Sequence, residues 1–308
     1  MFPTNKSILL GLGFLLLAFS SCGSEEIVNN EQNKDNGHKT AVLLVSHGSH
    51  SELWRNMLTD LETKVQDELL ANPDIDDVRS AFMEYTEPSI ATRMKELDAE
   101  GFDDVVVVPV FLTVSSHYSH DIPVILGVSS DPRAKDYMIG KEKIEVYKAK
   151  ANVSIVPPLD YTTLLKKNIA RRVKALSENA ENEGVLLVAY GDAMYNQQWE
   201  EMVEEIGKYL KIKTGHESVA YAWCGHLVEY STEPTENGIN QLFELEDKVI
   251  VVPVLVANDP YFQNDIIQKA VDNVERSLDV FYKQDAILPD ENLNQWVIDI
   301  TKQTLEKN

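Results

Sequence analysis

The sequence predicts an α/β protein made of two tandem domains, each a four-stranded parallel sheet flanked by helices. The run 42–49, VLLVSHGS, returns at 185–192 as VLLVAYGD, and the run 106–112, VVVPVFL, returns at 250–256 as IVVPVLV. These runs lack polar alternation, as in parallel strands that are covered on both faces. Helical patterns separate them, which implies right-handed crossovers within each sheet. One unit therefore occurs twice along the chain.

The first copy is expected over residues 40–178. Its helices are predicted where apolar residues recur at spacings of three and four, as Leu58 and Leu61 do. Its strands are predicted where Val, Ile and Leu run together, and Pro157 and Pro158 end the last of them. The expected strands are 41–45, 78–84, 105–112 and 153–156, and the expected helices are 50–71, 88–98 and 161–177.

The second copy is expected over residues 185–308, after a linker at 179–184 with the sequence NAENEG. It keeps the order of the first copy, and its segment 286–289, AILP, is matched with 154–157, SIVP. The expected strands lie near 185–189, 218–223, 248–256 and 285–288, and the expected helices lie near 195–210, 236–246, 263–281 and 292–305.

Residues 1–22 are predicted to be an export signal. Lys6 precedes the apolar run 8–19, which is too short to span a bilayer as a mature helix. The segment 18–22, AFSSC, resembles a bacterial lipoprotein processing site, at which Cys22 would carry the lipid. The alternative is a plain secretory peptide with an incidental cysteine.

Residues 23–39 are expected to form a flexible tether, because they hold few apolar side chains and many Asn, Glu and Lys. The run 24–26, SEE, is similar to the acidic export signals of surface lipoproteins in Bacteroidetes-type bacteria. The lipid would be the only membrane contact. The predicted location is the bacterial cell envelope, lipid-anchored at the outer membrane, with surface exposure left open.

The net charge of −22 argues against a nucleic-acid partner, because phosphate binding requires clustered Lys and Arg. It fits a domain that attracts cations. Besides Cys22 the chain holds only Cys224, so the sequence excludes an internal disulfide in the mature chain and any cluster of cysteines around zinc or iron–sulfur.

Two histidines mark the first copy as the functional one. His47 follows the first apolar strand and His117 follows another, whereas the second copy has Tyr190 and Tyr261 at the matching positions. Ligands of open α/β sheets bind beyond the carboxyl ends of the strands. Neighbouring strands are about 4.8 Å apart, so the two imidazoles can share one ion. Neutral imidazole suits Fe, Co, Ni and Zn, and Gly48 lets the backbone turn His47 toward the cleft.

Glu84 ends the strand that precedes the second helix and is predicted to point to the same rim, as a metal ligand or as a base. Its match in the second copy is taken to be Trp223, and the alternative is a solvated carboxylate at a strand end. His50 is either close to His47 or a solvated residue at a helix start. Asp121 is expected to cap the helix that contains Pro123. Three further histidines are interpreted as surface residues: His38, His216 and His226.

Together these motifs resemble the sirohydrochlorin chelatases, the class II cobalto- and ferrochelatases of cobalamin and sirohaem synthesis. The likeness covers 40–178 strongly and 185–308 weakly. It rests on the HGS at 47–49, the FMEYTEPS at 82–89, the PVFL at 109–112 and the SHYSHDIP at 116–123. The resemblance implies that His47 and His117 bind the metal with Glu84 as acidic partner. His50 stands where the family usually has arginine, and His120 is an added histidine that we include among the predicted metal ligands.

The function predicted from this resemblance is insertion of Co²⁺ or Fe²⁺ into a sirohydrochlorin-type tetrapyrrole. His47, Glu84 and His117 would be catalytic, and Tyr190, Trp223 and Tyr261 would form walls against which the macrocycle stacks. The rival hypothesis is an envelope lipoprotein that captures metal, haem or a corrinoid for an uptake system without catalysis.

Overall fold

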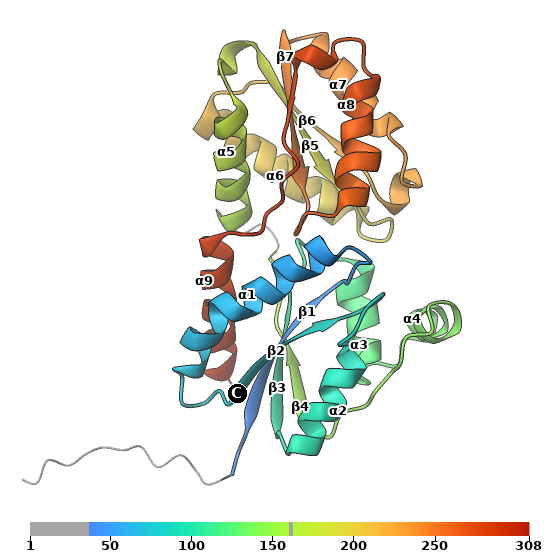
Figure 1. Ribbon diagram of the computed structural model, residues 1–308, viewed down its shortest axis with the longest axis vertical. Helices are drawn as coiled ribbons and strands as arrows, with labels where there is room; N and C mark the ends of the chain where they lie inside the picture. The colour runs from blue at the N-terminus through green and yellow to red at the C-terminus, as the bar shows by residue number, and fades with distance from the viewer. Residues whose placement is uncertain (1–36, 160–162, 308) are drawn as a thin grey trace, which may run out of the picture. The chain divides into compact units, whose positions relative to one another are not determined.

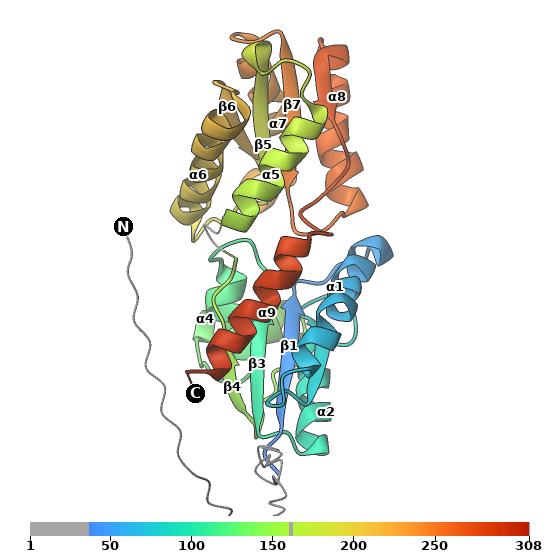
Figure 2. The same cartoon turned by 90° about the vertical axis from the view of Figure 1, so that its left-hand side faces the viewer.

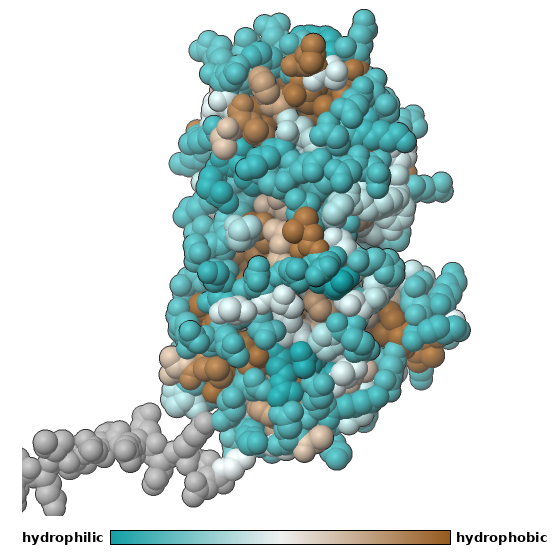
Figure 3. All heavy atoms as spheres, in the orientation of Figure 1, coloured by the Kyte–Doolittle hydropathy of each residue, from teal (hydrophilic) through white to brown (hydrophobic). Residues whose placement is uncertain are grey.

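A computed structural model describes residues 37–159 and 163–307. The predicted signal peptide 1–22, the lipidated Cys22 and most of the tether 23–39 lie outside these residues, so they stay predictions. Within the described part of the chain, no helix is both long enough and apolar enough to cross a membrane. Hydrophilic residues cover most of the face in Figure 3, and a hydrophobic patch interrupts them where the two halves meet.

The first half of the chain contains a four-stranded parallel sheet, as predicted. Its strand order is β2-β1-β3-β4, with β1 and β3 in the centre (Figure 1). Every residue of β1 is buried, which explains its unbroken apolar sequence. The strands are β1 (Thr40–Ser46), β2 (Asp77–Phe82), β3 (Asp104–Pro109) and β4 (Asn152–Ile155).

Local capping sets the starts of the two long helices of this half. Helix α1 (Glu52–Leu70) begins after Ser51, whose side chain accepts from the backbone N–H of Trp54. Helix α2 (Ile90–Glu100) begins after Ser89 in the same way. The loop after β3 contains shorter helical turns, namely η1 (His117–Asp121), α3 (Ile122–Ile125), α4 (Pro132–Lys135) and η2 (Asp136–Lys141).

The second half repeats the arrangement, with parallel strand order β6-β5-β7-β8. Its strands are β5 (Glu183–Ala189), β6 (Val219–Trp223), β7 (Lys248–Val254) and β8 (Val280–Tyr282). Its longer helices are α6 (Asn196–Thr214) and α7 (Glu233–Phe243). The remaining turns are η3 (Ala180–Asn182), η4 (His226–Val228), η5 (Tyr261–Gln268), α8 (Lys269–Asn273) and η6 (Ser277–Asp279). The predicted α/β duplication is thus confirmed.

The prediction of a strand at 285–288 was wrong. The fourth strand is β8, which pairs with residues 249–251 of β7. Ile287 and Leu288 are buried in a loop, and their N–H groups donate to the carbonyls of Leu255 and Val256, just past the end of β7. The apolar run 286–288 therefore reflects burial in the core and does not indicate a strand. The helix predicted over 263–281 also ends early, at Asn273.

The last helix of each half packs against the sheet of the other half. Helix α5 (Thr163–Leu176) lies against α6 and β7, and α9 (Glu291–Leu305) lies against α1 and β3 (Figure 2). The guanidinium of Arg172 on α5 is buried, and it donates to the carbonyl of Pro253 at 2.8 Å. The predicted ranges thus correspond to halves of the sequence, 40–178 and 185–308. In the folded protein, the last helix of each half packs against the other half.

Candidate metal and tetrapyrrole site

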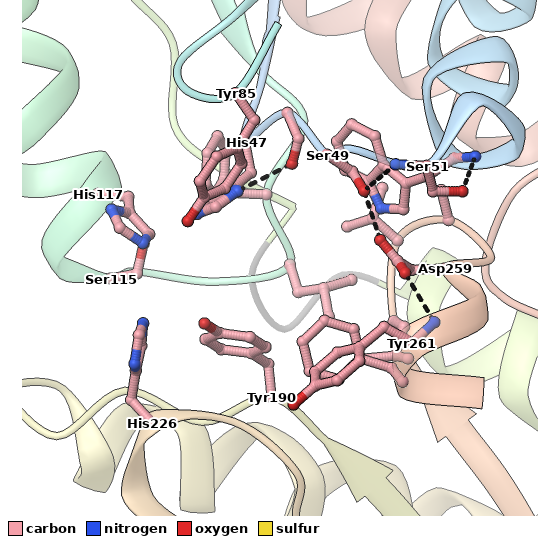
Figure 4. A pocket seen from close by; sticks show the side chains of 18 of the residues that line it. His47, Ser49, Ser51, Tyr85, Ser115, His117, Tyr190, His226, Asp259 and Tyr261 are labelled. Atoms are coloured by element: carbon pink, nitrogen blue, oxygen red, sulfur yellow. Dashed lines mark hydrogen bonds between the residues drawn. The ribbon is translucent and has the colours of Figure 1, made fainter. Parts of the chain in front are cut away.

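The carboxyl ends of the first-half strands bring three predicted residues together. His47 follows β1, Glu84 follows β2, and His117 follows β3, and β1 lies between the other two strands. One potential ligand atom from each residue lies within 4.8 Å of the others, and the two imidazole centroids are 4.8 Å apart. Figure 4 shows both imidazoles on one wall of a cavity of about 700 Å³ between the two halves. The three side chains are therefore close enough to share one ion, and the metal site stays a prediction.

Hydrogen bonds at the far nitrogen of each ring fix its tautomer. The Nδ1 atom of His47 lies 3.0 Å from the carbonyl oxygen of Gly48, and the Nδ1 atom of His117 lies 2.8 Å from an oxygen of Asp121. Because both oxygens accept, the neutral form of each ring carries its proton on Nδ1 and has its lone pair on Nε2. Burial, and then the neighbouring His117, lower the pKa of His47 to about 3. Its imidazole is therefore neutral at physiological pH.

Asp121 is the N-cap residue of α3, with Pro123 in the first turn as predicted, but its side chain makes no cap hydrogen bond. The π-helical turn η1 places Asp121 four residues after His117, on the same face, where it contacts the imidazole. A carboxylate behind a histidine raises the basicity of the outward nitrogen and orients the ring.

Glu84 is buried, only 6% exposed, so the alternative of a solvated carboxylate was wrong. Burial raises its pKa, and nearby His117 opposes that shift. Its Oε1 atom is buried and has no hydrogen-bond partner within the described structure. A buried carboxylate oxygen without a partner is costly, and a divalent cation next to two imidazoles would offset that cost. The donor set therefore fits a divalent transition metal.

The duplication aligns Glu84 with Gly225, and the predicted match with Trp223 was wrong. The N–H of Met83 donates to Ser46, and the N–H of Cys224 makes the same bond to Ala189. The residue that follows is Glu84 in one half and Gly225 in the other. The carboxylate is absent from the second copy, as the sequence argument requires.

The second half supplies the opposite, aromatic wall of the cavity. Tyr190 and Tyr261 line it as predicted, together with Tyr230 and Phe262. The Tyr190 ring packs edge-on against the ring of Phe262 at 5.5 Å, and its hydroxyl lies 3.0 Å from that of Tyr230. Together these contacts form an aromatic cluster facing the imidazoles (Figure 4).

The comparisons with known proteins agree with this geometry. The CbiX family model matches residues 41–176. A sirohydrochlorin cobaltochelatase of Saccharolobus solfataricus is 30% identical over 132 residues, which cover 43% of this chain and 91% of that relative. This chain belongs to the CbiX family. A sirohydrochlorin cobaltochelatase of Methanopyrus kandleri is 35% identical over 91 residues, covering 30% of this chain and 61% of the relative.

Two solved SirB structures share the two-half fold. SirB from Bacillus subtilis with Fe³⁺ superposes with a TM-score of 0.63 at 18% identity, covering 86% of this chain and 95% of SirB. SirB from Bacillus subtilis subspecies spizizenii in complex with cobalt gives 0.61 at 17% identity, over 87% and 96%. The predicted family resemblance is confirmed, and the structural likeness extends through both halves.

Two residues of the predicted site lie elsewhere in this CbiX chain. His120 is not in the metal group: its Nδ1 contacts Asp131 at 2.9 Å and its Nε2 contacts the Tyr195 hydroxyl at 3.0 Å. Trp223 does not line the cavity and packs instead against Trp199 and Tyr221. The reason is its position along the strand, since Trp223 ends β6 where Phe82 ends β2, two residues before Gly225.

Of the histidines interpreted as surface residues, His216 is placed differently, whereas His226 is exposed but belongs to the cavity. His216 is fully buried, and its Nε2 atom lies 3.4 Å from Glu183. His226 lines the cavity opposite His117 (Figure 4). Because Gly225 matches Glu84, His226 matches Tyr85, which also lines the cavity. An alignment of the two copies that pairs Glu84 with Gly225 would have pointed to His226 from the sequence.

Two serine–aspartate hydrogen bonds join the halves on either side of the cavity. Ser49 donates to Asp259 at 2.5 Å, and Ser116 donates to Asp192 at 2.6 Å through its hydroxyl and at 2.9 Å through its backbone N–H. The repeated sequence matches Ser49 with Asp192, so the first partners of the two bonds lie in corresponding turns after β1 and β5. The two bonds hold the two walls at a defined spacing.

Gly48 is required by a close backbone approach. Its φ is +99°, and a Cβ at this position would lie 2.0 Å from the carbonyl oxygen of Glu84. We expect Gly48→Ala to lower the free energy of unfolding by about 2 kcal/mol or more and to weaken Co²⁺ binding, because the HGS turn and the Glu84 segment must separate. Urea unfolding and cobalt calorimetry would measure the two effects.

Gly101→Ala is the matched control, because Gly101 has a φ of +76° but its Cβ would meet nothing within 4 Å. It should cost only the left-handed strain, about 1–2 kcal/mol, and leave cobalt affinity unchanged. Equal losses of cobalt affinity in both variants would contradict the steric argument.

Proposed function

We propose that this chain inserts Co²⁺ or Fe²⁺ into a sirohydrochlorin-type tetrapyrrole. The observation that carries this proposal is the convergence of two imidazoles, which line a cavity whose other wall is aromatic, with a buried carboxylate beside them whose Oε1 atom has no hydrogen-bond partner. The cavity volume of about 700 Å³ lies within the range of small-molecule and cofactor sites. The sirohydrochlorin chelatases among its relatives support the same reaction class.

The metal ion is a substrate that the site must hold and then release. In the proposed reaction, His47, His117 and Glu84 bind the ion, and the macrocycle enters between this wall and Tyr190. Imidazole and carboxylate form exchangeable bonds to Co²⁺ and Fe²⁺. The ring nitrogens can therefore replace the protein ligands one at a time.

Insertion of a divalent ion releases two protons from the pyrrole N–H groups. When the metal leaves His117, the freed Nε2 lone pair can accept one proton, and Asp121 at Nδ1 stabilises the resulting imidazolium. The Glu84 carboxylate, whose pKa is raised by burial, accepts the other proton after the metal has left it. Both protons can then pass to solvent, so that one divalent cation has replaced two protons on the ring.

The test is metallation by the purified full-length protein. Sirohydrochlorin is mixed with Co²⁺ or Fe²⁺, and the absorption spectrum is followed with the wild type, with the His47→Ala/His117→Ala double variant and without protein. The proposal expects the wild type to accelerate metallation well above both controls. Equal rates in all three would overturn it. The envelope location and the lipid on Cys22 remain separate predictions.

A further inference from the structure

A second cavity adjoins the cavity between the two halves, which we call the main cavity. The second cavity has a volume of about 360 Å³, and we call it the side pocket. Three residues line both cavities, namely His117, Asp192 and His226, so the cavities meet there. Figure 4 shows His117 and His226 on opposite sides at that place. The side pocket therefore reaches the metal group of His47, Glu84 and His117 at one of its three residues.

The outer wall of the side pocket belongs to a segment that only the first half has. The first half places residues 126–151 between α3 and β4, whereas the second half has only residues 274–279 between α8 and β8. The longer segment contains α4 and η2, and α4 lies beyond α3 in Figure 1. It lines the side pocket with Asp131, Arg133, Ala134 and Tyr137. The half that carries the metal group thus also builds a second cavity that leads to it.

The charges of the side pocket suit a divalent cation. Among the described residues, its lining holds the carboxylates of Asp121, Asp131 and Asp192 against one guanidinium, that of Arg133. The Arg133 side chain is 73% exposed, and its Nη2 atom lies 3.6 Å from a carboxylate oxygen of Asp131. Its charge is therefore screened by water and offset by one carboxylate. The net charge of the lining is negative, which raises the local concentration of cations.

The same lining offers the ion no strong resting place. Each of the three carboxylates already accepts a hydrogen bond from a neighbouring side chain, as Asp192 does from Ser116. Within the described part of the chain, the one group of three imidazole or acidic side chains close enough to hold an ion is the metal group itself. A cation is therefore attracted into the side pocket and passes on to His117.

The sizes of the two cavities separate the two substrates. Six waters around a divalent ion occupy about 180 Å³, at about 30 Å³ per water, so a hydrated ion fits the side pocket. A macrocycle that fills the main cavity, with its volume of about 700 Å³, does not fit a pocket of about 360 Å³. The ring is thus confined to the main cavity.

We propose, building on the proposed chelatase function, that the side pocket is the entrance for the metal ion and the main cavity the entrance for the macrocycle. A ring between the metal group and Tyr190 covers the main cavity, but it leaves the side pocket open to His117. The ion then reaches its ligands with the ring in place. The two substrates can therefore bind in either order.

The test measures release of Co²⁺ from the loaded full-length protein to an excess of a pyridylazo-resorcinol dye, with and without copper uroporphyrin. This ring is an octacarboxylate like sirohydrochlorin, and its nitrogens already hold a metal, so no insertion occurs. An ion leaves by the route through which it enters, and the stopped-flow absorbance of the cobalt–dye complex gives the rate. We expect the ring to leave release from the wild type nearly unchanged.

Ala193→Trp is designed to block the side pocket. Ala193 is an exposed residue of its lining and belongs neither to the main cavity nor to the metal group. With the ring bound, the indole should slow release about tenfold or more. Without the ring, release should stay close to the wild-type rate, because the main cavity is open, and calorimetry should show unchanged cobalt affinity. Ala99→Trp, at an exposed position of α2 outside both linings, is the matched control and should release like the wild type.

Met194→Arg tests the charge of the path independently of its width. Met194 lines the side pocket and is 54% exposed. With the ring bound, the added cation should slow release about threefold, the scale of an exposed charge pair, and about 1 M NaCl should abolish the difference, because the Debye length is then about 3 Å. Met194→Leu is the matched control and should change nothing. A wild-type rate for Met194→Arg at low salt would contradict a path past Met194.

A wild-type rate of release from Ala193→Trp with the ring bound would overturn this inference, and so would a ring that stops release from the wild type. Either result leaves the proposed chelatase function intact, because that function is tested by metallation of sirohydrochlorin. Conversely, a protein that metallates no ring, but whose Ala193→Trp variant retains Co²⁺ when the ring is bound, would sink the chelatase proposal and retain the metal entrance.

Discussion

Glu84→Gln should lower the turnover of metal insertion by about 100-fold or more, the usual scale for loss of a proton acceptor. Glutamine has nearly the same shape, but it can neither take a proton at neutral pH nor balance the charge of a divalent ion. Because Oε1 is buried without a partner beside two imidazoles, we also expect Co²⁺ affinity to fall by about tenfold. Steady-state metallation and calorimetry on the same variant would measure both quantities.

The two measurements separate the roles of Glu84. Unchanged cobalt affinity with low turnover would assign it to proton acceptance alone, and equal losses in both would assign it to metal binding alone. Glu244→Gln, an exposed glutamate on the second half, is the matched control and should alter neither. If Glu84→Gln had normal affinity and normal turnover, both roles would be wrong.

His47→Ala and His117→Ala should each weaken Co²⁺ binding by at least about tenfold, because each removes one of the two free Nε2 donors. The double variant should lose little more than the worse single variant, since residues that share one ion are not additive. Isothermal calorimetry gives affinity and stoichiometry for all three. Unchanged stoichiometry and affinity in either single variant would contradict a shared site.

Two other histidines serve as controls for this series. His38→Ala removes an exposed imidazole that contacts Asp104 and should leave cobalt binding unchanged. His120→Ala is more discriminating, because the sequence placed it among the ligands and the structure engages both its nitrogens with Asp131 and Tyr195. We expect no loss of cobalt affinity. A tenfold loss would restore the sequence-based assignment.

The fold was accessible from the sequence because its signals are local and repeated. The core strands β1 and β3 are buried on both faces, so their composition reports their environment directly. The error at β8 arose because Ile287 and Leu288 are buried by a loop that hydrogen-bonds beyond β7. An apolar run indicates that a segment is buried, but it does not indicate whether the backbone of that segment pairs within a sheet.

The site was only partly accessible, because whether a side chain reaches the cavity depends on its exact position past the strand end. Aligning Trp223 with Glu84 offset the two copies of the sequence by two residues. With this offset His226 was not recognised as a cavity residue, and Trp223 was wrongly predicted to line the cavity. His120 follows His117 by three residues, but the π-helical turn assigns Asp121 to His117 and turns His120 toward Asp131. Proximity in sequence could not distinguish these arrangements.

Because each half packs its last helix against the other half, neither half can bury its apolar face alone. Helix α9 covers the first sheet, so the face formed by α1 and β3 stays open until α9 has been synthesised. One continuous apolar cluster includes Leu58 from α1, Leu165 from α5 and Val297 from α9. A nascent first half thus exposes apolar surface for as long as the second half is being made. A cut within 179–182, before β5 begins, would leave two fragments that each need the other's last helix.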